Sequence, residues 1–215
     1  MQRLTWLAIV CLALALPAGA GDKKSQPAEA GAPSAAFFNG KDLTGWEGRM
    51  ECWTVRDGAI IGVTPNGLKA NTFLCSKKLY TDFELSFQVW LIGKTANSGV
   101  QIRSKVEEKT NYQCAGPQCD MGQIYWGSLY GEHFGGMMQQ APKDVVTRAL
   151  KEHEFNDYYI KCAGNHVTIK LNGQTTVDAD FPKMPKDGVI GWQLHAGGPM
   201  VVIFRNIRFT DLTTK

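Results

Sequence analysis

The chain has 215 residues and a formal net charge of +3, with 23 Lys and Arg against 20 Asp and Glu. The basic residues form no dense run, so the composition argues against a nucleic-acid partner or an anionic membrane surface.

The first residues, 1–20, have the layout of a signal peptide. Arg3 precedes an apolar run at 4–16, and small residues follow at 18–20. The apolar run is too short to span a bilayer comfortably. Cys11 lies inside the run, so it is not placed to carry a lipid anchor. We therefore expect a protein exported to the periplasm or the medium, with no membrane anchor after signal removal.

Residues 21–36, GDKKSQPAEAGAPSAA, contain too few large apolar side chains to offset the entropy of ordering. They are predicted to form a flexible linker. Residues 37–215 are within the size range of one domain with a sizeable core.

Period-two alternation of apolar and polar residues dominates this domain. In DFELSFQVW (82–90), Phe83, Leu85, Phe87 and Val89 fall on one face, and Glu84, Ser86, Gln88 and Trp90 on the other. Similar strands are expected within 52–63, 158–178, 188–195 and 199–209. Turn dipeptides stand between them: Asp57-Gly58, Gly164-Asn165, Asn172-Gly173 and Asp187-Gly188. This pattern predicts an antiparallel β-sandwich or jelly roll.

One long segment, 107–152, shows few regular signals, and its one helical pattern, at 141–152, is interpreted as part of a loop. Loops of this length inside a compact domain are usually functional.

Polar residues of three predicted strands could share one face. In NSGVQIRS (97–104), Val100 and Ile102 suit the core, which places Gln101 and Arg103 on the opposite face; Gln193 and His195 alternate in the same way within 188–195. With Glu84 they could form one continuous polar surface. Most such faces are merely solvated. Gln, Arg, His and Trp together, however, suit recognition of hydroxyl-rich ligands.

Five cysteines follow the signal peptide. Cys114 and Cys119 could close the short loop CAGPQC, and Cys52 with Cys75 is a second candidate disulfide, although sequence alone does not fix the connectivity. A metal site is less favoured, because Cys-x4-Cys occurs once without a matching second pair. Cys162 is expected as a small apolar residue in a strand.

The chain from about Phe37 to Leu212 resembles the 3-keto-disaccharide hydrolase domain family (domain of unknown function 1080), which has a concanavalin A-like sandwich. The resemblance is carried by FFNGKDLTGW (37–46), WTVRDGAIIG (53–62), DFELSFQVW, NSGVQIRS, YWGSLYGE (125–132), EFNDYYIKCAGNHVTIKLNG (154–173) and GWQLHAGG (191–198). It implies cleavage of glycosides whose C3 hydroxyl is oxidised to a ketone: a base removes the C2 proton, the C1 substituent leaves, and water adds back.

That chemistry needs a base, an acid and donors aimed at the developing enolate oxygen. Asp120 matches an acidic position of the family and is expected to act as a base or metal ligand; the alternative is an Asx-type loop residue. His195 is the best histidine candidate, because a group that titrates near neutrality suits proton transfer; the alternative is a structural His at a strand end, capped by backbone. Glu84 is a third catalytic candidate. Gln101, Arg103 and Gln193 are expected to position substrate, although Arg103 could instead pair with Glu84 across the sheet.

The expected rim of the pocket is Tyr125, Trp126 and Glu132. The expected ligand is a small carbohydrate. No cofactor is assigned, and a divalent metal held by Asp120, Glu84 and His195 stays open. The rival hypothesis is a lectin-like binding module without chemistry, because such sandwiches carry both functions.

Overall fold

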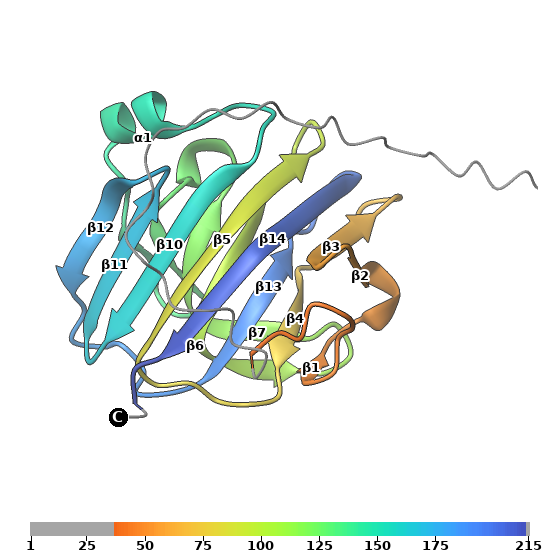
Figure 1. The fold of residues 1–215 in the computed structure, drawn as a ribbon, viewed down its shortest axis with the longest axis horizontal. Helices are drawn as coiled ribbons and strands as arrows, with labels where there is room; N and C mark the ends of the chain where they lie inside the picture. The colour runs from red at the N-terminus through yellow and green to blue at the C-terminus, as the bar shows by residue number, and fades with distance from the viewer. Residues whose placement is uncertain (1–36, 214–215) are drawn as a thin grey trace, which may run out of the picture.

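A computed structural model describes residues 37–213 (Figure 1). The expected signal peptide (1–20) and linker (21–36) lie outside the described residues. Among the described residues, no helix is both long and apolar enough to cross a membrane.

Two seven-stranded antiparallel sheets form a concanavalin A-like β-sandwich, a jelly roll, as the alternation and the resemblance predict. Sheet A has the order β1 (Trp46–Glu47), β4 (Thr72–Ser76), β13 (Val189–Leu194), β6 (Ser98–Glu108), β7 (Gln113–Met121), β8 (Leu129–Glu132) and β9 (Gly136–Gln139). Sheet B has the order β12 (Gln174–Asp180), β11 (His166–Leu171), β10 (Asn156–Ala163), β5 (Phe83–Ile92), β14 (Met200–Asp211), β3 (Ala59–Thr64) and β2 (Trp53–Arg56). In Figure 1 sheet B stands in front of sheet A.

Within residues 37–213, helical structure is limited to η1 (Met50–Cys52), η2 (Gln123–Tyr125) and α1 (Lys143–Ala149). The expectation of a loop at 107–152 is wrong, because this segment holds β7, β8, β9 and α1 as well as the end of β6. CAGPQC contains Gly and Pro, which usually signal a turn, but here its residues lie inside a strand.

Three of the four expected tight turns connect neighbouring strands. Asp57-Gly58 and Asn172-Gly173 adopt positive φ angles at the β2–β3 and β11–β12 connections, and Gly164 does so between β10 and β11. Gly188 instead forms an isolated bridge with Tyr80.

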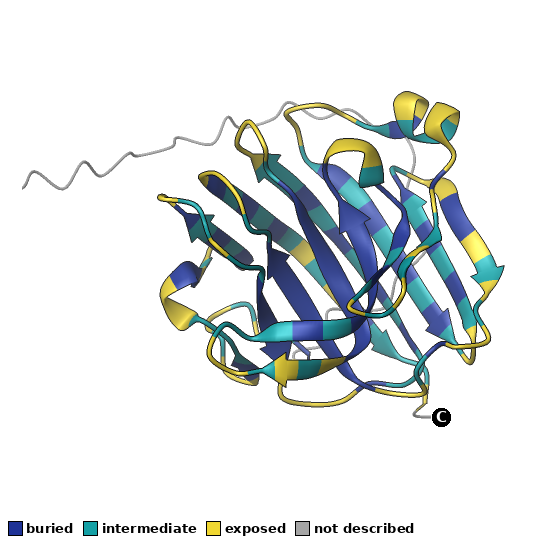
Figure 2. Ribbon diagram, turned by 180° about the vertical axis from the view of Figure 1, so that it is seen from behind, coloured by how far each residue is buried: buried dark blue, intermediate teal, exposed yellow. Residues whose placement is uncertain are grey.

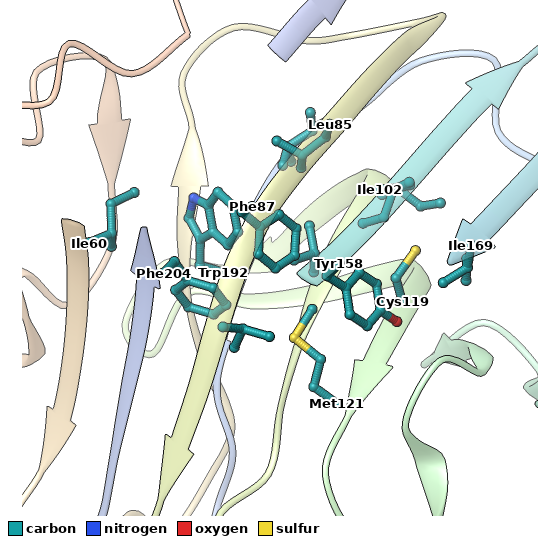
Figure 3. Close-up of a cluster of buried hydrophobic side chains, with 14 of the residues drawn as sticks. Ile60, Leu85, Phe87, Ile102, Cys119, Met121, Tyr158, Ile169, Trp192 and Phe204 are labelled. Carbon is teal, nitrogen blue, oxygen red and sulfur yellow. The ribbon is translucent and has the colours of Figure 1, made fainter. Parts of the chain in front are cut away.

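The core lies between the two sheets, and the alternation predicts its members correctly. The predicted inward residues of β5, together with Val100, Ile102, Trp192 and Leu194 of sheet A, are all buried. Figure 3 shows Phe87 of sheet B between Trp192 of sheet A and Tyr158, with ring centroids 5.2 and 5.4 Å away. Cys162 is buried in β10, as expected.

A bulge in β6 redirects the hairpin that β6 forms with β7. Gln101 pairs with Gln118 and Lys105 pairs with Ala115, so β6 carries one residue more than β7 over this interval. Arg103 takes a φ of 47° here. Gly116 (φ 148°) makes room for the bend, because a Cβ at this position would lie 2.2 Å from the Ser104 hydroxyl. Bulges bend a strand and increase its twist.

Beyond the bulge, the hairpin folds back over the outer face of sheet A. We call residues 105–115 the β6–β7 arm. Figure 2 shows this arm crossing in front of the sheet. At its tip the Asn111 carbonyl accepts a hydrogen bond of 2.5 Å from the Thr72 hydroxyl, and Lys109 Nζ lies 3.3 Å from Glu47. The arm therefore buries a face that would otherwise meet solvent.

Candidate functional site

Four polar side chains lie together on the outer face of sheet A: Gln101, Gln118, Asp120 and Gln193. All four are buried. Gln101 is opposite Gln118, and Asp120 is opposite Gly99. Gly99 is the residue that allows the cluster, because a Cβ there would lie 2.7 Å from the Gln118 side chain. The missing side chain leaves room for the Gln118 amide.

Directed hydrogen bonds connect these side chains. The Ser104 hydroxyl donates to Gln101 Oε1 over 2.5 Å, and Gln101 Nε2 donates to Gln118 Oε1 over 3.0 Å. Gln118 Nε2 donates to Asp120 Oδ1 over 2.5 Å and to Gln193 Oε1 over 3.3 Å. The donors from Ser104 through Gln101 and Gln118 all point toward Asp120, so each bond of this series strengthens the next, and Gln193 is bonded to it as a branch at Gln118.

Asp120 is the titrating group of this cluster. Burial raises its pKa to about 7, a hydrogen bond from Gln118 partly opposes this, and the charge of Glu132 adds to it. A carboxylate with a pKa near neutrality can both accept and release a proton under mild conditions. Asp120 therefore has the properties of a general base.

Gln193 contributes a free donor. Its Nε2 is buried and has no hydrogen-bond partner, a property shared within residues 37–213 only by the indole nitrogens of Trp53 and Trp192. Both indoles belong to the core cluster, whereas Gln193 lies on the outer face with Asp120. A buried unsatisfied N–H is costly, which makes it a natural contact for an acceptor atom of a ligand.

His195 and Glu132 lie at the margin of the cluster. His195 directly follows β13, and its Nδ1 is 2.6 Å from the Ala196 carbonyl, so Nδ1 carries the proton and Nε2 is left for other contacts. Glu132, on β8, accepts a hydrogen bond of 2.8 Å from the Asn71 amide. Asn71 Oδ1 in turn accepts from the Ala196 N–H, so Asn71 connects the end of β13 to β8.

Two expected site residues lie elsewhere. Glu84 is on β5 of sheet B, where its carboxylate lies 3.0 Å from Lys161 Nζ. Arg103 does not face Gln101, because the bulge turns its side chain away. Its guanidinium donates to the carbonyls of Thr81, Gly164 and Pro185 and to Asp82 Oδ1 at 2.7 Å. The expected single face thus loses both residues, and the alternative Arg103–Glu84 pair does not form.

The expected aromatic rim is also changed. Trp126 is buried in the core cluster between the sheets, so it is not exposed at a pocket rim. Tyr125 is half-buried in η2, while Tyr130 is opposite Gln118 and shares its face.

Gln118, which connects Gln101, Asp120 and Gln193, was not among the expected residues. The sequence signal for Gln118 is the period of two. Gln118 and Asp120 flank the buried Cys119 in the sequence, so both side chains lie on the strand face opposite Cys119.

Both expected disulfides are wrong in this structure, where all five described cysteines are free thiols. Cys114 and Cys119 lie on the same strand, in two different hydrophobic clusters. Cys52 likewise belongs to the core cluster and Cys75 to the second one. The structure instead brings Cys75 and Cys114 together, with sulfurs 3.4 Å apart.

The proposed metal ligands do not come together, because Glu84 is in sheet B. Within residues 37–213, no three His, Cys, Asp or Glu side chains are grouped as a metal site.

Two surface hollows, of about 450 and 610 Å³, are present. The smaller lies beside Asn39, Asp57 and Arg205, and the larger beside the arm, next to Ser104 and Val189. Neither hollow is lined by Asp120 or Gln193.

Solved structures share this fold. Two Parabacteroides distasonis proteins that carry a provisional glycosyl hydrolase assignment are 22% and 21% identical, with TM-scores of 0.59 and 0.58; the matches cover 80% and 82% of this chain and 96% and 92% of theirs. The carbohydrate-binding module CBM66 from Bacillus subtilis is 14% identical with a TM-score of 0.56, over 77% of this chain and 94% of the module.

No curated protein matches the chain. The family model described as the 3-keto-alpha-glucoside-1,2-lyase-like domain matches residues 33–210, and the chain belongs to this family.

Proposed function

We propose that this protein cleaves 3-keto-glycosides, with Asp120 as the base that removes the C2 proton. The observation that carries the proposal is the buried Asp120 carboxylate, held by Gln118, with a pKa raised to about 7. The name of the family, a 1,2-lyase of 3-keto-α-glucosides, supports the same bond change.

A C3 ketone acidifies the proton on C2. When Asp120 takes that proton, the electron pair of the C–H bond forms the C2–C3 double bond and the ketone becomes an enolate. The enolate then collapses: the C3 carbonyl re-forms, a C1–C2 double bond appears, and the bond from C1 to the leaving oxygen breaks. Addition of water across this double bond completes a net hydrolysis.

Negative charge develops on the C3 oxygen during proton removal. The free Nε2–H of Gln193 is the donor assigned to this oxygen, because it is buried, unpartnered and joined to Asp120 through Gln118. Donors that are fixed before the reaction stabilise such charge without reorganisation.

The leaving oxygen needs a proton. His195 is the assigned acid, since its Nδ1 is engaged by the Ala196 carbonyl and its Nε2 is left to exchange a proton with the substrate.

Export of the protein, expected from residues 1–20, remains part of this proposal.

The test is proton exchange in deuterated water. Purified protein is incubated with methyl 3-keto-α-glucoside, and NMR follows deuterium at C2 together with loss of methanol. Both signals should appear with the wild type. Methyl α-glucoside, which lacks the ketone, should show neither. Binding of the keto-sugar without exchange or cleavage would remove the enzyme proposal.

A lectin-like module is the second candidate. It is favoured by the low exposure of Asp120, which is 6% accessible, and by the similarity in fold to a carbohydrate-binding module. Exchange at C2 separates the two functions, because a binding module would retain the sugar with its C2 proton unchanged.

A further inference from the structure

Two cysteines are in contact where the arm packs against sheet A, and no sequence motif predicts this pair. Cys75 lies on β4 and Cys114 on β7, at the base of the arm, and their sulfurs are 3.4 Å apart. Both residues are fully buried. The bulge at Arg103 and Gly116 creates this contact, because it bends the hairpin back over the outer face.

The surroundings of the two sulfurs hold them in place. Phe73, Val189 and the partly buried Val106 pack with Cys75 and Cys114 in a small cluster separate from the main core. The hydrogen bond from Thr72 to Asn111 and the ion pair between Lys109 and Glu47 fix the same arm against the same edge of sheet A. The sulfurs therefore face each other as a consequence of several independent contacts.

We propose that Cys75 and Cys114 are a disulfide site whose cross-link fastens the arm over the outer face of sheet A. A disulfide bond is about 2.05 Å long, so the sulfurs have to approach by roughly 1.4 Å. The remaining described cysteines, Cys52, Cys119 and Cys162, belong to the core cluster between the sheets.

The reaction is thiol–disulfide exchange with a low-molecular-weight disulfide such as oxidised glutathione. One cysteine thiolate attacks the glutathione disulfide and releases one glutathione thiolate; the second cysteine then attacks the mixed disulfide and releases the other. The two thiol protons end on the two glutathione molecules, so two cysteines are oxidised and one disulfide is reduced.

The folded site protects the thiols from this exchange. The hydrogen bond with Cys75 and burial raise the pKa of Cys114 well above its ordinary value, and a protonated thiol is a poor nucleophile. The mixed disulfide with glutathione is therefore expected to form during folding, before the arm closes, and closure of the arm then brings the second cysteine to it.

The experiment is refolding of the full chain from denaturant with reduced and oxidised glutathione, and in parallel with excess reductant. After alkylation and proteolysis, mass spectrometry should find the peptides of Cys75 and Cys114 joined, with a mass lower by two hydrogen atoms than the sum of the reduced peptides. Recovery of both cysteines as alkylated thiols under the oxidising condition would overturn the proposal.

Thermal unfolding gives a second readout. The melting temperature of the oxidised wild type should exceed that of the reduced form by roughly 10 °C, because the cross-link closes a long loop. Cys75→Ala and Cys114→Ala should each lose this difference, whereas the matched control Cys52→Ala should keep it. An equal redox effect in all three variants would also contradict the site. Neither readout depends on the proposed enzymatic activity.

Discussion

Gln118 donates its amide N–H to the carboxylate of Asp120 over 2.5 Å, and both side chains project from β7 onto the outer face of sheet A. This contact orients the carboxylate and connects it to Gln193, whose own amide N–H is free. The base and the donor of the proposed reaction are thus held by one shared amide.

Asp120→Asn should reduce kcat/KM on a 3-keto-glucoside by at least about 100-fold, because an amide cannot accept the C2 proton. The amide oxygen can still accept the hydrogen bond from Gln118, so the fold should persist. Glu84→Gln is the matched control, since it makes the same chemical change in sheet B and should leave turnover unaltered. Wild-type turnover in Asp120→Asn would remove this residue from the mechanism.

The raised pKa of Asp120 predicts how stability changes with pH. Its folded pKa is about 7, against an ordinary value of 3.8. Between these values the folded chain keeps a proton that the unfolded chain releases, so this group makes the protein less stable as the pH rises from about 4 to 7. Linkage sets the upper limit near 4 kcal/mol.

Asp120→Asn removes this titration. The melting temperature of the variant minus that of the wild type should therefore increase from pH 4 to pH 7. A flat difference for Asp120→Asn would show that the carboxylate titrates alike in both states.

Gln193→Met should lower turnover without lowering the stability of the fold. Methionine fills a similar volume without the unsatisfied N–H, so the free energy of unfolding should stay constant or rise by about 1 kcal/mol. Turnover should fall by roughly 100-fold, because the developing enolate loses its donor. Gln174→Met, on an exposed position of β12, is the control. Normal turnover in Gln193→Met would exclude this side chain as the donor.

Alternation predicted the core and the members of each strand face, because strand geometry determines which side chains share a face. It could not predict that Glu84 and Gln101 belong to different sheets, since strand order depends on the connections between strands. The face of Arg103 was also missed, because the bulge shifts the phase of the alternation by one residue. The place of Gln118 on the polar face could not be predicted either, because the neighbouring Gly116 and Pro117 indicate a loop where the structure has strand β7.

His195→Ala should have an effect that depends on the leaving group. Methyl 3-keto-α-glucoside should react about 100-fold more slowly, because methoxide needs a proton as it leaves. A nitrophenyl 3-keto-glucoside should react at nearly the wild-type rate, since nitrophenolate leaves without protonation. Equal losses with both substrates would indicate a role in binding or folding rather than in acid catalysis.

Arg103→Met should lower stability and leave chemistry intact. The guanidinium is 2% exposed and joins Thr81, Gly164, Pro185 and Asp82 at one end of the sandwich, so its loss leaves three carbonyls without their donor. We expect a loss of about 2–4 kcal/mol in the free energy of unfolding, measured by urea denaturation. Arg103→Lys should recover only part of it, because one ammonium cannot reach four acceptors. Turnover per folded molecule should match the wild type in both variants; a loss of turnover with unchanged stability would instead return Arg103 to the substrate site.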